Sequence, residues 1–314
     1  MTRAVTIGAA QLGPVQRDHT REDVVDRLLA LLRQGAEHGC ALVVFPELAL
    51  TTFFPRYHIT DEAELDQWYE TAMPGPETQP LFDEAARLGV GFSLGYAELQ
   101  VDEATGERHR YNSQVLVERD GSVVGTYRKV HLPGHQEHEP WRPFQHLEKL
   151  YFEPGPDGFE VWRAFGGVVG MAICNDRRWS ETYRVMGLLG VELICIGYNT
   201  PVHNPPAPEH DRLGEFHNHL VMQAGAYQNG TWVVGVAKAG DEEGVAMIGG
   251  SAIIAPSGEI AARCVTEGDE LAVAVADLDM GASYRRSVFD FAAHRQTWAY
   301  ARITEQTGAE PPPE

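Results

Sequence analysis

The sequence predicts an α/β protein built on mixed β-sheets, and three observations support this prediction. Short apolar runs, each long enough for one buried strand, alternate along the chain with segments of helical periodicity. A helical segment between the apolar runs at 5–10 and 41–45 forms a β-α-β unit, which requires parallel strands and a right-handed crossover. Hairpin patterns elsewhere require antiparallel neighbours, so the sheets are mixed and helices must cover their faces.

The first half of the chain carries clear local signals for each element. Thr20 and Asp23 form a capping box at the start of the first helix, and Gly39 ends it. Beyond the strand at 41–45 we expect a helix at 80–88, a strand at 90–98, and a hairpin at 111–130 that turns at Asp120-Gly121. The loop at 131–158 has no clear periodicity, and loops of this length in a compact domain are usually functional.

The second half of the chain again alternates predicted strands with predicted helices. We expect strands at 168–173, 191–198, 231–238 and 271–276, a hairpin at 251–262, a helix from Ser180 to Leu189 capped by Ser180, and a helix at 210–229 with Phe216, Leu220 and Ala224 on one face. No repeat or linker divides this series. The sequence therefore predicts one domain over residues 1–304, followed by a flexible tail at 305–314.

The charge balance narrows the classes of partner. The chain of 314 residues has 45 acidic and 25 basic residues and a net charge of -20. A surface this acidic repels phosphate backbones and anionic lipids, which argues against nucleic-acid and membrane partners. An anionic substrate would need a local basic pocket.

The N-terminal segment and the cysteines indicate a cytoplasmic protein. The opening residues lack the basic-then-apolar layout of a secretory signal, and no uncharged run is long enough to span a membrane. The four cysteines, Cys40, Cys174, Cys195 and Cys264, are scattered without a C-x-x-C pair, as is typical of reduced thiols.

Three chemically reactive residues share one position relative to the predicted strands. Glu47, Lys129 and Cys174 each lie at the carboxyl end of a strand. In an open α/β sheet the crevice beyond these ends is where ligands bind. Taken singly, each has a structural alternative: a capping carboxylate, a surface lysine and a small buried thiol.

Two arginines follow the cysteine directly. Arg177 and Arg178 precede a helix start, where the helix dipole disfavours cations. Bidentate binding of a carboxylate would explain them. A cationic pair would also lower the pKa of the Cys174 thiol and favour the thiolate.

Metal and cofactor patterns are weak. His131, His135, His138 and His146 have a spacing that fits no standard ligand set, so we expect no metal, and scaffolding of the loop is the alternative for them. Gly249-Gly250 lacks the strand-loop-helix context of a dinucleotide site, so we expect no cofactor. His217 and His219 are predicted to be surface or packing residues.

Five motifs resemble the nitrilase superfamily of carbon-nitrogen hydrolases, and within it most closely the N-carbamoyl-D-amino-acid hydrolases. They are FPELALTTFFPR, YRKVHLPGH, PFQHLEK with YFEPG, CNDRRW, and GYNTP with HNPP. The resemblance implies a four-layer αββα sandwich that forms homodimers or homotetramers. It also implies a triad of Glu47 as general base, Lys129 as oxyanion stabiliser and Cys174 as nucleophile.

The resemblance assigns supporting roles as well. Glu148 becomes a second carboxylate beside the triad, and His131 and His146 become hydrogen-bonding groups near the pocket. The backbone N–H of Asn175 would join Lys129 at the oxyanion.

Three functions follow from this set. The first is hydrolysis of N-carbamoyl-D-amino acids, with Arg177, Arg178, Asn199 and Thr200 binding the α-carboxylate. The second is the same chemistry on N-carbamoyl-β-alanine, an aliphatic amide or a nitrile. The third is a non-catalytic binding or scaffold protein that keeps the fold.

Overall fold

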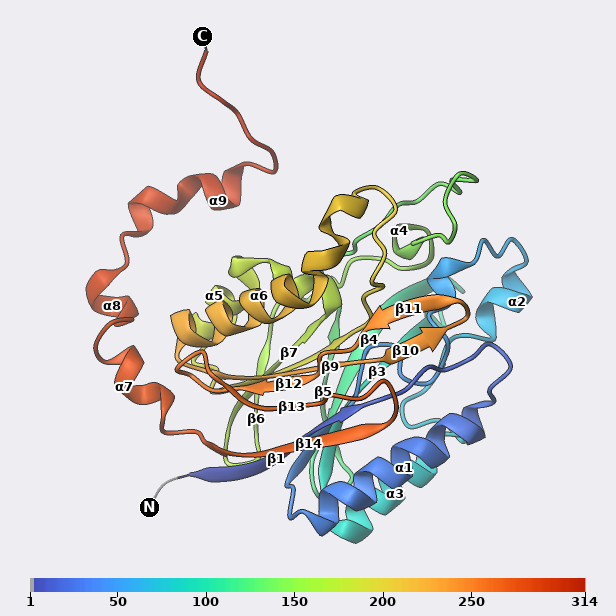
Figure 1. Ribbon diagram of the computed structural model, residues 1–314, viewed down its shortest axis with the longest axis horizontal. Helices are drawn as coiled ribbons and strands as arrows, with labels where there is room; N and C mark the ends of the chain where they lie inside the picture. Colours follow the sequence, from blue (N-terminus) through green and yellow to red (C-terminus); the bar gives the residue numbers. More distant parts are fainter. Residues whose placement is uncertain (1–2, 314) are drawn as a thin grey trace.

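A computed structural model describes residues 3–313 and shows two six-stranded mixed sheets packed face to face, with helices on the outer face of each (Figure 1). The predicted four-layer αββα arrangement is confirmed. Among residues 3–313, no helix is both long enough and apolar enough to cross a bilayer.

The first sheet has the strand order β14-β1-β2-β3-β4-β5. Its strands are β1 (Ala4–Gln11), β2 (Leu42–Val44), β3 (Gly91–Val101), β4 (Arg108–Val117), β5 (Val123–Arg128) and β14 (Glu270–Asp277). Strands β1, β2 and β3 are parallel, because α1 and α3 make the crossovers between them, and the other neighbours are antiparallel.

The second sheet has the order β13-β12-β9-β8-β7-β6. Its strands are β6 (Val161–Ala164), β7 (Gly167–Ile173), β8 (Leu193–Tyr198), β9 (Trp232–Ala237), β12 (Ala252–Ile254) and β13 (Ile260–Arg263). Strands β7, β8 and β9 are parallel. A separate hairpin consists of β10 (Ala239–Glu242) and β11 (Val245–Ile248).

Helices α1 (Arg21–Glu37) and α3 (Gln79–Leu88) cover the first sheet, and α5 (Ser180–Leu188) and α6 (Gly214–Asn229) cover the second (Figure 1). The shorter helices are α2 (Glu62–Asp66), α4 (Glu148–Tyr151), α7 (Gly281–Arg285), α8 (Phe291–His294) and α9 (Ala301–Glu305). Short 3₁₀ turns lie at Phe54–Arg56, Cys174–Arg178, Pro208–Leu213 and Thr297–Tyr300. Helices α7 and α8 lie against the outer helices α5 and α6, with the Phe289 ring 4.9 Å from that of Tyr227 and Arg184 over the Phe291 ring. The chain then continues through α9, and residues 306–313 form no helix or strand (Figure 1).

Alternation along the strands divides the apolar side chains between two cores. Leu42 and Val44 of β2 face the second sheet, whereas Val43 between them faces α1 and α3. All three are fully buried. Burial of each such side chain stabilises the folded protein by roughly 1.5–3 kcal/mol relative to leaving it exposed. A shift of one residue along β2 would turn these side chains to the wrong layer, so the alternation fixes which face of β2 meets which layer.

The two predicted helix caps differ in the structure. The capping box of Thr20 and Asp23 is present at α1. At α5 the predicted cap is wrong, because Ser180 is the first helical residue and its hydroxyl donates to Glu181 rather than capping a backbone N–H.

The predicted apolar face of α6 is not the packed face. Phe216 is 60% exposed and Leu220 is 47% exposed. Polar and small residues such as Asn218 and Gly225 are buried instead, because Asn218 binds a buried arginine and a Cβ on Gly225 would meet the Tyr183 ring. The helix therefore packs through these contacts together with the buried side chains of Met222 and Ala226, and not through Phe216 or Leu220.

Two glycines let the sheets close around Glu47, which follows β2. A Cβ on Gly95 of β3 would lie 2.6 Å from the Glu47 Cα, and a Cβ on Gly197 of β8 would lie 2.5 Å from the Glu47 nitrogen. The backbone of Glu47 thus sits between one strand of each sheet, at the edge where β2, β7, β8 and β9 end.

Replacing Gly197 by alanine should lower the free energy of unfolding by roughly 1–3 kcal/mol, because the new methyl group overlaps the Glu47 backbone. Urea denaturation of the variant measures this loss. Gly268→Ala is the matched control, since a Cβ there meets no atom within 4 Å. Equal stability of the two variants would contradict the close approach.

Candidate active site

The site is built around the ammonium group of Lys129, which lies directly after β5. Its Nζ donates to Glu47 Oε1 at 2.7 Å and to Glu148 Oε2 at 2.5 Å. All three side chains are 0% exposed. The structure therefore brings together Glu47 from the first sheet, Lys129 from the hairpin strand and Glu148 from α4.

Glu47 has further partners that fix both of its carboxylate oxygens. Asn112 Nδ2 donates to Oε1 at 2.8 Å, and the Asn199 backbone N–H donates to Oε2 at 2.8 Å. The side chain of Asn199 also donates to the Glu47 carbonyl oxygen at 2.7 Å. This carboxylate cannot rotate away from Lys129 without losing several hydrogen bonds.

The two carboxyl groups differ in proton affinity. Burial and the nearby charge of Glu148 raise the pKa of Glu47, although Lys129 opposes the shift. Burial would also raise the pKa of Glu148, but the charge of Lys129 and the hydrogen bond from His146 lower it. Burial would lower the pKa of Lys129, yet the charges of Glu148 and Glu47 outweigh it and raise that pKa. Glu47 is thus the carboxyl suited to exchange a proton.

Cys174 lies at the sharp turn after β7, with φ of 46°. This left-handed value is uncommon for a residue with a side chain and costs roughly 1–3 kcal/mol. Asp176 holds the turn, because its Oδ2 accepts from the Ile173 N–H at 3.0 Å and from the Tyr127 hydroxyl at 2.7 Å. The Cys174 Sγ lies 3.6 Å from the Asn199 carbonyl oxygen and 3.6 Å from Arg177 Nη1.

The prediction that a cationic pair lowers the thiol pKa is wrong in its net direction. Burial, followed by the charge of Glu47, raises the pKa of Cys174, and Lys129 and Arg177 only partly offset this. The resting residue is therefore a thiol. It needs a base to become a nucleophile, and Glu47 is the adjacent carboxylate.

A cavity of about 410 Å³ opens onto the thiol. Of the predicted site residues, it is lined by His146, Cys174, Asn175, Arg178, Asn199 and Thr200. Glu47, Lys129 and Glu148 lie behind this wall, fully buried.

The two arginines occupy different environments. Arg177 is fully buried, and its guanidinium donates to Asn218 Oδ1 at 2.8 Å, Thr200 Oγ1 at 2.9 Å and the Cys174 carbonyl oxygen at 2.6 Å. The side chain of Arg178 lines the cavity and forms no hydrogen bond or ion pair with any residue from 3 to 313. A carboxylate in the cavity can therefore meet Arg178, whereas Arg177 holds the turn that carries Cys174.

The loop histidines have separate partners. His131 Nδ1 lies 2.8 Å from Asp176 Oδ1, outside the cavity, and His146 Nε2 lies 2.9 Å from Glu148 Oε1. His135 pairs with Gln145, and the ring of His138 stacks on that of His58. Within the described residues, no group of three or more His, Cys, Asp or Glu side chains is arranged to hold a metal ion.

Several site residues were not found from the sequence. Asn112 binds Glu47, Asn218 binds Arg177, and His217 lines the cavity although it was predicted to be a surface or packing residue. Asn112 lies on a strand and Asn218 on a helix, and no local pattern distinguishes them. The one signal that the sequence offers is a polar residue at a position where the strand or helix pattern predicts burial.

We expect iodoacetamide at pH 7 to alkylate Cys174 faster than the other cysteines. Cys174 lines the cavity and has Glu47 beside it as a base. The other three cysteines do not line this cavity, and burial raises the pKa of Cys40 to about 11 and those of Cys195 and Cys264 to about 12. Peptide mass spectrometry gives the four rates, and Glu47→Gln should change the rate of Cys174 only. Equal rates for all four would favour a non-catalytic protein.

Comparisons with known proteins place this site in a family. The family model described as Carbon-nitrogen hydrolase matches residues 6–286. A citrullinase of Francisella tularensis is 34% identical over 80% of this chain and 82% of its own length. A nitrilase of Pyrococcus abyssi is 30% identical over 79% of this chain and 81% of its own length. An N-carbamoylputrescine amidase of Arabidopsis thaliana is 29% identical over 82% of this chain and 82% of its own length.

A solved structure agrees with the fold. The carbon-nitrogen hydrolase from Helicobacter pylori superposes with a TM-score of 0.81 at 22% identity, covering 97% of this chain and 99% of that one. With the family model spanning nearly the whole chain, the buried carboxylate, ammonium and thiol described above lie in a protein that belongs to the carbon-nitrogen hydrolase family.

Proposed function

We propose that this carbon-nitrogen hydrolase acts on N-carbamoyl-D-amino acids and releases the D-amino acid, ammonia and carbon dioxide. One observation carries the proposal: the cavity that reaches the Cys174 thiol is also lined by Arg178, whose guanidinium has no ionic partner among the described residues. A substrate with a reactive carbonyl at one end and a carboxylate near it would meet both groups.

The first half of the reaction forms a covalent intermediate. Glu47 takes the Cys174 proton, and the thiolate sulfur attacks the ureido carbonyl carbon. The Lys129 ammonium and the Asn175 N–H stabilise the oxyanion, and losing one such donor costs about 3–4 kcal/mol in the well-studied case. Glu47 then gives its proton to the departing amine nitrogen, leaving a carbonyl group joined to sulfur.

The second half uses water. Glu47 takes a proton from a water molecule, whose oxygen attacks the thioester-type carbonyl, and the proton is returned to the sulfur as the C–S bond breaks. When the amino acid is the amine that departs first, the second half gives carbamic acid, which decomposes to ammonia and carbon dioxide. When ammonia departs first, the second half gives the N-carboxy amino acid, which decomposes to the amino acid and carbon dioxide. Glu148, held by His146, keeps its negative charge and thereby keeps Lys129 protonated throughout.

The names of the relatives support ureido compounds as the substrate class. Two of the relatives are named citrullinase and N-carbamoylputrescine amidase. Carbamoylputrescine ends in an amine rather than a carboxylate. In this cavity the acidic lining residue, Asp211, already accepts from His203 Nδ1 at 2.7 Å, which leaves Arg178 as the charge better placed to meet a substrate. N-carbamoyl-β-alanine is the second candidate, because the same arginine accommodates a β-carboxylate. An aliphatic amide is the remaining alternative, and it would not need Arg178.

The cellular setting is also a proposal. We propose a cytoplasmic homodimer or homotetramer that binds a small carboxylated substrate. Exposed apolar side chains support association, among them Leu188 at 49% and Phe216 at 60% exposure on the outer helices, and Trp298 at 80% exposure in the 3₁₀ turn at Thr297–Tyr300.

Ammonia release from matched D and L N-carbamoyl amino acids and from a neutral amide tests the substrate class. Wild-type protein should prefer the D compound, and Arg178→Ala should raise the KM for carboxylated substrates at least tenfold, because a charge-assisted pair is worth roughly 1.5–3 kcal/mol. The KM for the neutral amide should change little. Equal effects on the charged and neutral substrates would contradict the role of Arg178.

A further inference from the structure

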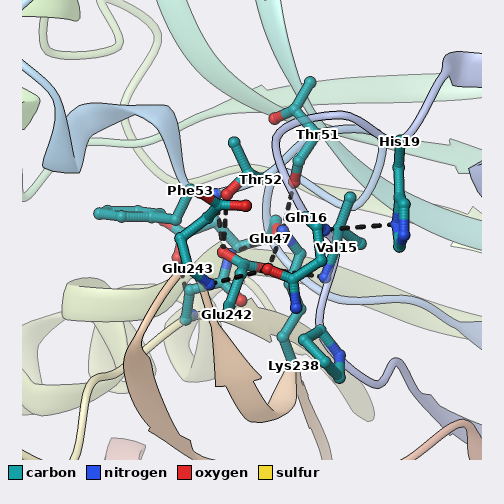
Figure 2. Close-up of polar contacts among 12 residues, drawn as sticks. Val15, Gln16, His19, Glu47, Thr51, Thr52, Phe53, Lys238, Glu242 and Glu243 are labelled. Carbon is teal, nitrogen blue, oxygen red and sulfur yellow. Dashed lines mark hydrogen bonds and ion pairs between the residues drawn. The ribbon is translucent and has the colours of Figure 1, made fainter.

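A second group of buried charges lies next to the site, and the proposed reaction does not use it. We call it the Lys238 cluster: Arg56, Lys238 and Glu242 (Lys238 and Glu242 are drawn in Figure 2). Lys238 and Glu242 are 0% exposed, and Arg56 is 5% exposed. Lys238 lies between β9 and β10, and Glu242 ends β10.

The cluster holds backbone as well as side chains. Glu242 Oε1 accepts from Arg56 Nη2 at 2.7 Å and from the Phe53 N–H at 2.8 Å. Glu242 Oε2 accepts from the Val15 N–H at 3.0 Å and lies 3.2 Å from Lys238 Nζ, which also donates to the Thr51 carbonyl oxygen (Figure 2). Most of these contacts end on one loop, residues 48–56.

That loop connects the two carboxylates of the site. It begins directly after Glu47. At its other end, the carbonyl oxygens of Pro55 and Arg56 accept from the N–H groups of Leu147 and Gln145, at 2.8 and 3.1 Å. The Phe53 ring also meets the His146 ring edge-on, with centroids 5.4 Å apart. The cluster therefore fixes the chain that leads from Glu47 to the segment carrying His146 and Glu148.

The two buried groups have complementary charge. The Lys238 cluster holds two cations and one carboxylate, whereas Glu47, Lys129 and Glu148 comprise one cation and two carboxylates. Burial lowers the pKa of Lys238, and the charges of Glu242 and, more weakly, Glu47 oppose that shift. The same interaction acts in reverse, so a protonated Lys238 favours an ionised Glu47.

We infer that the Lys238 cluster is a positioning group of this active site, and that its surplus positive charge favours the anionic form of the Glu47–Cys174 pair. The inference deepens the proposed function and rests on it. The residues of the cluster lie behind Glu47 and do not line the cavity, so they act through Glu47 and not on a substrate.

Other charges face the same pair and must be held constant in a test. Glu47 faces Lys129, which follows β5, Glu148 of α4, and Lys238. Cys174 faces Glu47, Lys129, Arg177 and Glu148, and also Arg178 and the Tyr198 hydroxyl. None of these is altered in the variants below except Lys238.

The test is the pH dependence of Cys174 alkylation by iodoacetamide, which needs no substrate. Lys238→Met removes a positive charge and should move the midpoint of alkylation to higher pH by about 0.5 to 1 unit. Glu242→Gln removes a negative charge and should move the midpoint to lower pH. Lys238→Arg should retain the wild-type midpoint, as should Lys149→Met, in which the charge lost is exposed and screened by water.

Opposite shifts in the two variants support the inference, because a purely structural role would displace Cys174 in both without regard to charge. Shifts in the same direction, or no shift in proteins that unfold cooperatively, overturn it. If Lys238→Met fails to fold, Arg56→Gln removes the same unit of charge and takes its place. A wild-type protein that hydrolyses no carbamoyl compound would refute the proposed function, while the alkylation profile would still decide this inference.

Discussion

The buried ammonium of Lys129, held between the carboxylates of Glu47 and Glu148, is the interaction on which the site depends. Removing one partner of such a buried group leaves an uncompensated charge and costs roughly 3–5 kcal/mol. Three elements distant in the sequence must therefore meet at one place, and each fixes the others. The same arrangement separates the proton affinities of the two carboxyl groups, which leaves Glu47 as the one that can accept a proton from the Cys174 thiol.

Backbone constraints place the reacting residues against this group. Gly95 and Gly197 allow strands of both sheets to approach the Glu47 backbone, and Asn199 connects Glu47 with the thiol through its N–H and its carbonyl oxygen. The left-handed backbone of Cys174 is held by Asp176 and Arg177. Arg177 makes structural contacts in this frame. Arg178 and Arg142 both line the cavity, and of these two only Arg142 has an ionic partner among residues 3–313, namely Glu139.

The parts of the fold that depend on local pattern could be predicted from the sequence. The alternation of strands and helices, the parallel pairing of β1 with β2 and the Thr20 capping box each follow from a few adjacent residues. Strand ends also identified Glu47, Lys129 and Cys174 as candidates, and the resemblance of their motifs to a known family joined them into one site.

What could not be predicted depends on contacts across the chain. Asn112, Asn218 and the Lys238 cluster are ordinary polar residues until the fold surrounds them with partners. The direction of the Cys174 pKa required the depth of burial, which outweighs the neighbouring cations. The different roles of Arg177 and Arg178 also depend on the fold, because only the Arg177 side chain reaches buried hydrogen-bond acceptors.

The central claim, that Glu47 is the base for Cys174, is tested most directly by a ¹³C NMR titration of protein labelled at the glutamate carboxyl carbons. The signals of Glu47 and Glu148 are assigned from Glu47→Gln and Glu148→Gln. We expect a midpoint for Glu47 above the ordinary value of 4.5 and a midpoint for Glu148 below it. The reverse order would contradict the assignment of Glu47 as the base that serves Cys174.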